Sequence, residues 1–174
     1  MQKKINSVIE KKKKFDGDLF ILPHSPEKTL QGKIPTLMKD VYRDASPMLS
    51  ARFRLYGRWE NATHGNWLSM SDMAHLWAQP IQDEFIDLIK FQSECLRKDW
   101  SNNAFALFKE DRLSLFAGSD IGNEAIFLLW LDDEVEPEIW VYDANGESRY
   151  KNFNDYLVAY LNDDVSAATV SWRI

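Results

Sequence analysis

The chain is poor in the residue types that build covalent or metal-based sites. It holds one cysteine, Cys95, and three histidines. A single thiol cannot form an internal disulfide, which favours a reducing, cytoplasmic location. Because Cys95 falls within a helical pattern, we interpret it as a small core residue rather than a nucleophile. His24, His64 and His75 show no metal-like spacing with each other or with Cys95, which argues against a structural zinc site.

Motifs for nucleotide binding and for acyl transfer are also missing. No Gly-x-Gly-x-x-Gly, phosphate-loop or Gly-x-Ser-x-Gly pattern occurs. Gly118 and Gly122 bracket three residues, which predicts a tight turn rather than a nucleotide loop. We therefore expect no cofactor, no bound metal and no catalytic activity.

Long apolar runs are absent as well. The longest, from Ala125 to Leu131, has the length of a strand, far below the roughly 18 residues of a membrane helix. No apolar segment follows the N-terminal lysines, so the pattern of a secretory signal is missing. We expect no contact with a membrane.

Positive charge is scarce beyond the N-terminus. The net charge is −6, yet residues 1–14 hold six lysines and one glutamate, a local charge of +5. The rest of the chain therefore carries −11. Such an acidic body disfavours binding to nucleic-acid phosphates and is compatible with a basic protein partner. The Lys11–Lys14 run is most simply a solvated helix end, which the helix dipole favours.

A large apolar fraction, 45% with seven tryptophans, is what the chain does have. It suffices for one domain spanning residues 1–174, and no linker or internal repeat divides the sequence. Ile5, Val8 and Ile9 have the spacing of a helix docked by one apolar edge, over about residues 3–15.

The first half of the chain predicts several short elements. Residues 16–36 are loop-like, and we expect a helix to start after Pro35. Alternating apolar residues within 51–68 predict a strand. A short helix is expected over 71–78, with Ser71 as its N-cap.

The strongest helical pattern spans residues 81–98, with Pro80 near its start. Its apolar stripe should pack on a sheet. The stripe consists of Ile81, Phe85, Leu88, Ile89, Gln92, Cys95 and Leu96.

From residue 104 onward the pattern changes to strands. The run Ala125–Leu131 is apolar on both faces, which predicts a central strand covered on each side. A helix over Phe153–Leu161 is expected to begin at Asn152 or Asn154. The sequence therefore predicts an α+β domain, with a mostly antiparallel sheet and helices packed on it. Further strands are expected at 105–109, 112–117, 138–143 and 169–173.

The order of the C-terminal elements resembles that of the SUKH superfamily, over roughly the last third of the chain. In the family a small-residue turn precedes an apolar strand, a second strand follows, and then a helix. The first hundred residues match loosely, with Ile34-Pro35 or Leu22-Pro23 in place of an early motif. The matching positions are Ala117–Asn123, Ala125–Leu131, Ile139–Asp143 and Phe153–Leu157.

The resemblance implies a SUKH-like fold and two kinds of function. Bacterial members are immunity proteins that neutralise toxins, frequently nucleases. Members similar to the Smi/Knr-type cell-wall assembly regulators are regulatory scaffolds.

Two features are candidates for a partner surface. Five carboxylates lie within seven residues: Asp132, Asp133, Glu134, Glu136 and Glu138. The spacing is not that of a calcium-binding EF-hand loop, and a hydrolase would need two carboxylates in different environments. We interpret this acidic link either as a solvated connection or as a surface for a basic protein. The fold gains nothing evident from concentrating charge there.

Trp59 and Trp67 flank a polar turn and form the second candidate. Aromatic side chains rimmed by polar groups commonly anchor interfaces, and burial in the core is the alternative. The leading prediction is a non-catalytic immunity protein that binds a basic toxin. A scaffold without a toxin partner is the alternative, and a hydrolase is the least favoured function.

Overall fold

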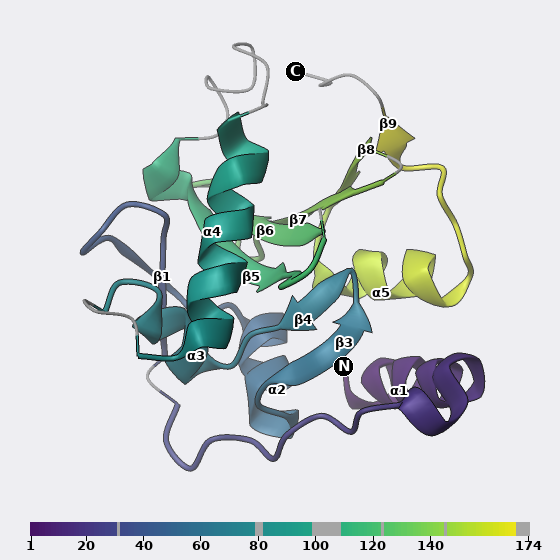
Figure 1. Ribbon diagram of the computed structural model, residues 1–174. Helices are drawn as coiled ribbons and strands as arrows, with labels where there is room; N and C mark the ends of the chain where they lie inside the picture. The colour runs from purple at the N-terminus through teal and green to yellow at the C-terminus, as the bar shows by residue number, and fades with distance from the viewer. Residues whose placement is uncertain (31, 79–81, 99–108, 123, 145, 170–174) are drawn as a thin grey trace.

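The computed structural model describes residues 1–30, 32–78, 82–98, 109–122, 124–144 and 146–169, and its class is α+β (Figure 1). The helices are α1 (Gln2–Asp16), α2 (Pro47–Leu55), α3 (Met70–His75), α4 (Glu84–Lys98) and α5 (Phe153–Leu161), with short 3-10 turns η1 (Gly17–Leu19) and η3 (Glu110–Arg112). The strands are β1 (Lys33–Pro35), β2 (Tyr42–Asp44), β3 (Trp59–Thr63), β4 (Gly65–Trp67), β5 (Leu113–Gly118), β6 (Ala125–Leu129), β7 (Glu138–Asp143), β8 (Gly146–Tyr150) and β9 (Ala168–Thr169).

The main sheet is an antiparallel meander, in which each strand pairs with the next one along the chain. Its order is β3-β4-β5-β6-β7-β8-β9, and β1 and β2 form a separate hairpin. The predicted strand Ala125–Leu131 is confirmed as β6, which lies in the middle of the sheet and is buried throughout. Short connections join β3 to β4 and link β5, β6, β7 and β8 in succession, whereas α3 and α4 lie between β4 and β5 and α5 lies between β8 and β9.

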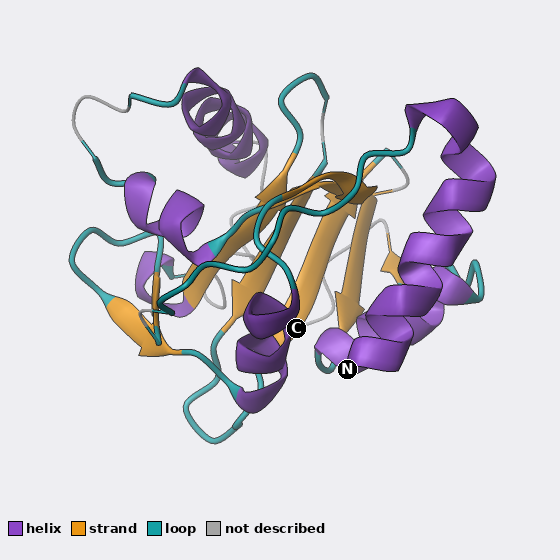
Figure 2. Cartoon of the chain, turned by 90° about the horizontal axis from the view of Figure 1, so that it is seen from below, coloured by secondary structure: helices purple, strands orange, loops and turns teal. Residues whose placement is uncertain are grey.

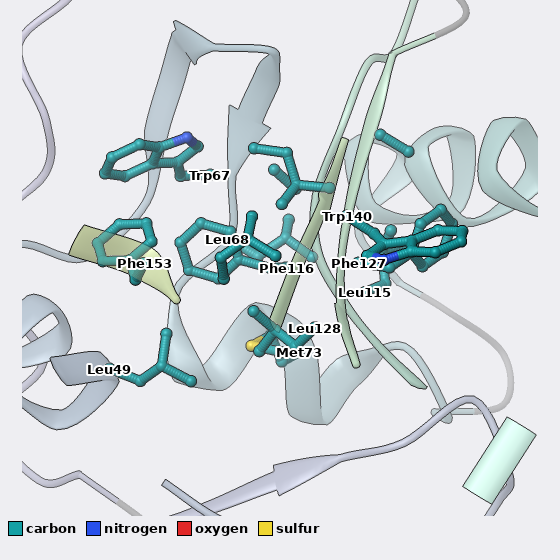
Figure 3. Packing of buried hydrophobic residues seen from close by; sticks show 14 of the residues in the cluster. Leu49, Trp67, Leu68, Met73, Leu115, Phe116, Phe127, Leu128, Trp140 and Phe153 are labelled. Atoms are coloured by element: carbon teal, nitrogen blue, oxygen red, sulfur yellow. The ribbon is translucent and has the colours of Figure 1, made fainter. Parts of the chain in front are cut away.

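Side chains pack on both faces of the sheet, as the two-faced apolar run predicts. Leu115, Phe127 and Trp140 are cross-strand neighbours and lie on one side of the strands (Figure 3). Phe116 and Phe153 lie on the other side. The buried hydrophobic residues form one continuous cluster.

Helix α4 packs on the sheet, but its buried stripe differs from the predicted one. It begins at Glu84, and the predicted start at Pro80 and Ile81 lies outside the described residues. Leu88, which the stripe included, is 48% exposed. The side chains that α4 buries are Ile86, Ile89, Ser93 and Leu96.

The segment after Pro35 contradicts the sequence prediction. No helix forms there. Instead, the Thr36 backbone N–H donates to the Val41 carbonyl oxygen at 2.8 Å, and the Thr36 hydroxyl oxygen lies 3.2 Å from the Met38 carbonyl oxygen and 3.0 Å from that of Val41. These bonds close the turn between β1 and β2 and stop a helix from starting.

The strand predicted within 51–68 is also wrong in its first part, which is helix α2. Ser46 caps this helix and Pro47 occupies its first turn, a combination that favours helix initiation.

The short helix α3 is present, but it starts from Ser69 rather than Ser71. Ser69 and Asp72 form a reciprocal capping box.

The terminal helices agree with the prediction. Helix α1 buries Ile5, Val8 and Ile9 and packs beside α5 (Figures 1 and 2). Asn152 caps α5 by accepting a hydrogen bond from the backbone N–H of Asp155.

Residues 105–108 and 170–173 of the predicted strands lie outside the described residues. Among the helices that the structure describes, none combines the length and the apolar character that crossing a bilayer requires.

Candidate functional site

The acidic link joins β6 to β7 at one end of the sheet. Two of its five carboxylates, those of Asp133 and Glu134, are exposed and make no side-chain hydrogen bond or ion pair within the described part of the chain. They are therefore available to a partner.

The other three carboxylates have partners in the chain itself. Asp132 lies 3.4 Å from Arg43 on β2 and 2.8 Å from Arg112 in η3. Glu138, at the start of β7, pairs with Arg149 on β8. These ion pairs connect the start of the link to β2 and η3, and its end to β8.

Glu136 has a more specific structural role. Its carboxylate accepts hydrogen bonds from the Ser46 hydroxyl and from the backbone N–H of Met48 at 2.9 Å. This N–H belongs to the first turn of α2, where donors lack intrahelical partners and a negative charge is favourable. The expectation that the fold gains nothing from these acids is therefore wrong for three of the five.

The second predicted surface, Trp59 and Trp67, does not exist. Both side chains are 1% exposed, and their ring centroids lie 5.3 Å apart. Their indole N–H groups donate to Ile21 O (3.0 Å) and Thr63 Oγ1 (2.8 Å). The two tryptophans belong to the core and cannot anchor an interface at the surface.

Arg52 is a buried cation in the same aromatic region, and no sequence pattern predicted its burial. It is 1% exposed, and its guanidinium lies 4.7 Å from the Phe53 ring centroid and 5.5 Å from that of Trp67. It donates to the carbonyl oxygens of Tyr56 and Gly57. Burial lowers the pKa of Arg52 to about 9. Its bonds connect the end of α2 to the start of β3.

A small pocket at the opposite end of β7 was missed at the sequence level. It lies along β8, between the β3–β4 turn, the last residue of β7, α5 and the segment after α5, and its volume is about 170 Å³. Its lining side chains combine rings and acids: His64, Asp143, Tyr150, Tyr156, Tyr160, Asp163 and Asp164, with Ser148, Ala159 and Val165 completing the wall.

A hydrogen-bond chain forms the floor of this pocket. The buried Tyr156 hydroxyl donates to Thr63 Oγ1 at 2.6 Å, and His64 Nδ1 lies 2.8 Å from the Tyr156 oxygen. On its other side, His64 Nε2 lies 3.3 Å from Asp143 Oδ2. Both ring nitrogens of His64 therefore face groups of the chain itself.

The electrostatic environment of the pocket is negative. Burial raises the pKa of Tyr150, and the charges of Asp143 and Asp164 raise it further. Burial likewise raises the pKa of Tyr160 to about 12, with contributions from Asp16, Asp163 and Glu124. A phenol beside carboxylates resists ionisation, and the same field favours a cation.

Gly65 holds the β3–β4 turn against the sheet. It has φ of +79°, and a Cβ there would lie 2.7 Å from the backbone carbon of Gly118. Only glycine combines this backbone angle with so close an approach. Because His64 precedes Gly65, this contact positions the imidazole over the pocket.

The turn from Gly118 to Gly122 is not shaped for a nucleotide. The Ser119 hydroxyl accepts hydrogen bonds from the backbone N–H groups of Ile121 (3.2 Å) and Gly122 (2.9 Å). These donors are thus already used within the turn, although a wider cavity of about 640 Å³ lies beside it. This agrees with the predicted tight turn.

Metal binding finds no support in the described residues, where no group of three or more His, Cys, Asp or Glu side chains is arranged around a common point. Cys95 is half-buried on α4. His24 lies 3.9 Å from Glu60 and is not among the residues that line the pocket of His64.

Comparison of the chain with protein-family models, with curated proteins and with solved structures gave no match. The resemblance to the SUKH superfamily therefore stays a prediction from the order of the C-terminal elements.

Proposed function

We propose that this protein is a non-catalytic binding module that recognises a basic protein through the acidic link. The observation that carries the proposal is the contrast within that link. Asp133 and Glu134 are exposed and without partners among the described side chains, while Asp132, Glu136 and Glu138 fix the segment around them. An ordered loop loses little conformational entropy on binding, which favours association with a cationic surface.

The geometry at His64 also favours binding over catalysis. A general base needs a ring nitrogen that can reach a substrate proton. Nδ1 of His64 faces the hydroxyl of Tyr156 and Nε2 faces Asp143, and Tyr156 is 0% exposed, so this hydroxyl is not placed to act as a nucleophile on a substrate from solvent. A hydrolase therefore remains the least favoured function.

Within this class, we infer an immunity protein that acts in the cytoplasm and blocks a basic toxin domain such as a nuclease. The acidic surface supports this because it is complementary to a domain that binds nucleic acid. A regulatory scaffold of the Smi/Knr-like type is the alternative, and it would use the same surface without a toxin partner.

The test compares two double variants with the same change of charge. Asp133→Asn with Glu134→Gln removes the free carboxylates of the link. Asp87→Asn with Glu94→Gln removes two exposed carboxylates on α4, which likewise have no side-chain partner within the described ranges. The partner to be tested is any toxin domain that a neighbouring gene encodes.

The link variant should associate with the toxin about 2- to 10-fold more slowly at low salt, and its rate should depend less on salt. The α4 variant should bind like the wild type. If a neighbouring toxin binds and both variants associate equally fast, the acidic link is not the binding surface. If no neighbouring toxin exists or none binds, the immunity function is wrong.

A further inference from the structure

An exposed apolar surface lies where helix α1 ends and the chain turns toward β3. Four large apolar side chains within residues 15–22 face solvent, and we call them the apolar tip: Phe15, Leu19, Ile21 and Leu22. Phe15 is 87% exposed and Leu19 is 80% exposed. Helix α1, which carries the tip at its end, lies at one edge of the molecule (Figures 1 and 2). Single exposed apolar residues are ordinary, whereas a group of them marks an interaction site.

The backbone of the tip is fixed by hydrogen bonds to the start of β3. The indole N–H of Trp59 donates to the carbonyl oxygen of Ile21 at 3.0 Å, and the backbone N–H of His24 donates to that of Arg58 at 2.8 Å. Phe20, which lies between the exposed residues, packs against the hydrophobic core. An ordered surface loses little conformational entropy on binding, and this favours association.

The charges around the tip nearly balance. Two ion pairs neutralise the neighbouring side chains of α1: Lys12 with Asp16 at 2.8 Å, and Lys13 with Glu10 at 2.9 Å. Lys14 and Asp18 are exposed and make no ion pair among the residues that the structure describes. The rim of the tip therefore offers one free cation and one free anion.

This balance indicates which occupant the tip fits. Attraction to an anionic membrane takes several free lysines, and the rim offers one. A second copy of the chain is complementary, because a two-fold axis places Lys14 of each copy opposite Asp18 of the other while the apolar side chains cover one another. Residues 1–14 carry a charge of +5, so two acidic copies repel each other least on this side.

From these observations we propose that the apolar tip is a self-association surface, which packs on the same tip of a second copy in a two-fold dimer. Two such tips bury on the order of 1,000 Å² in total, at the lower limit of specific interfaces. The dissociation constant should therefore be on the order of 10–100 μM. The tip shares no residue with the acidic link, so the proposal is independent of the proposed function.

Sedimentation velocity of the full chain, from about 5 μM to about 1 mM, tests the proposal. The weight-average mass should rise with concentration from 20.3 kDa toward twice that value. Leu19→Glu should weaken the dimer by about 10-fold or more, because it places a charge in an apolar contact. Ile121→Glu is the matched control, since Ile121 is 91% exposed in the β5–β6 connection, outside the tip, and it should leave self-association unchanged.

Two charge reversals test the two-fold arrangement. Lys14→Glu and Asp18→Lys should each weaken self-association by about 2- to 30-fold, because each replaces two ion pairs by two contacts between like charges. An equimolar mixture of the two variants should recover the dimer, because each acid then faces a lysine of the other copy. A folding defect in either variant would not be repaired by mixing.

Four results would overturn the proposal. One is a mass that stays at 20.3 kDa up to about 1 mM. Another is a dimer that Leu19→Glu leaves intact, and a third is the lack of recovery when the charge variants are mixed. The fourth is a monomer that sediments with phosphatidylglycerol vesicles through the tip, which would assign this surface to lipid. None of these measurements uses a toxin, so a failure here is distinguishable from a failure of the proposed function.

Discussion

The two ends of strand β7 carry acidic groups in opposite settings. Glu138 begins the strand beside an open, exposed link, and Asp143 ends it beside a pocket walled by rings. Six residues of strand separate these two positions by about 17 Å. At the first end, arginines and a helix terminus neutralise most carboxylates, and two face solvent. At the second end, aromatic burial and one lysine surround the acids.

This difference shows that acidic composition alone does not define a site. Glu136 and Glu134 belong to the same run, yet one caps α2 and the other is exposed without a side-chain partner in the described structure. Asp143 lies outside the run, yet it lines the pocket of about 170 Å³. The surroundings of each carboxylate decide whether it stabilises the fold or is available to a ligand.

The pocket end should be the more fragile of the two. Replacement Gly65→Ala should lower the free energy of unfolding by about 3 kcal/mol, because a Cβ would clash with the Gly118 backbone at an unfavourable φ. Urea unfolding measures this loss. Gly32→Ala is the matched control, since Gly32 also has positive φ (+68°) but nothing within 4 Å. It should cost about 1–2 kcal/mol, and equal losses for both variants would show that the close contact is unimportant.

Within the acidic link, the anchored and free carboxylates should separate in stability. Glu136→Ala removes the acceptor for Ser46 and Met48, so it should cost about 1–2 kcal/mol in the same unfolding measurement. Glu134→Ala should change stability by less than about 0.5 kcal/mol. A similar cost at both positions would mean that the whole link, including its exposed part, supports the fold.

The smallest effect concerns pH and is confined to the alkaline range. The pKa of Tyr160 is about 12 in the folded protein, above the roughly 10 of an unfolded chain. The folded state therefore holds this proton more tightly, so its contribution to stability is present below pH 10 and is lost as pH rises toward 12. Tyr160→Phe should reduce the alkaline loss relative to the wild type.

Unfolding curves at a series of alkaline pH values, with phenolate absorbance, measure this difference. Tyr42→Phe is the control, because Tyr42 is 51% exposed on β2 and should leave the alkaline loss unchanged. If Tyr160→Phe and the wild type lose stability in parallel, the ring does not lie in a buried acidic pocket.

Much of the fold followed from local sequence patterns. The two-faced apolar run predicted β6 at the centre of the sheet, and the spacing of Ile5, Val8 and Ile9 predicted α1. Asn152, the cap of α5, was one of the two predicted caps for the same reason, since a helix N-terminus is set by residues within one turn. Ser46 and Pro47 are local signals for α2 as well. The alternation of apolar residues after residue 51 nevertheless led to the prediction of a strand.

The sites were decided by tertiary structure. Asp132 is neutralised by Arg43, which is distant in the chain, and Glu136 by the first turn of α2. His64 and Tyr156 meet only because the β3–β4 turn folds over α5. Periodicity reports which face of an element is buried, because it depends on neighbours a few residues apart. It carries no information on which distant side chains share that face. The sequence by itself therefore determined elements such as β6 and α1, and packing decided which charges are paired and that Arg52 is buried.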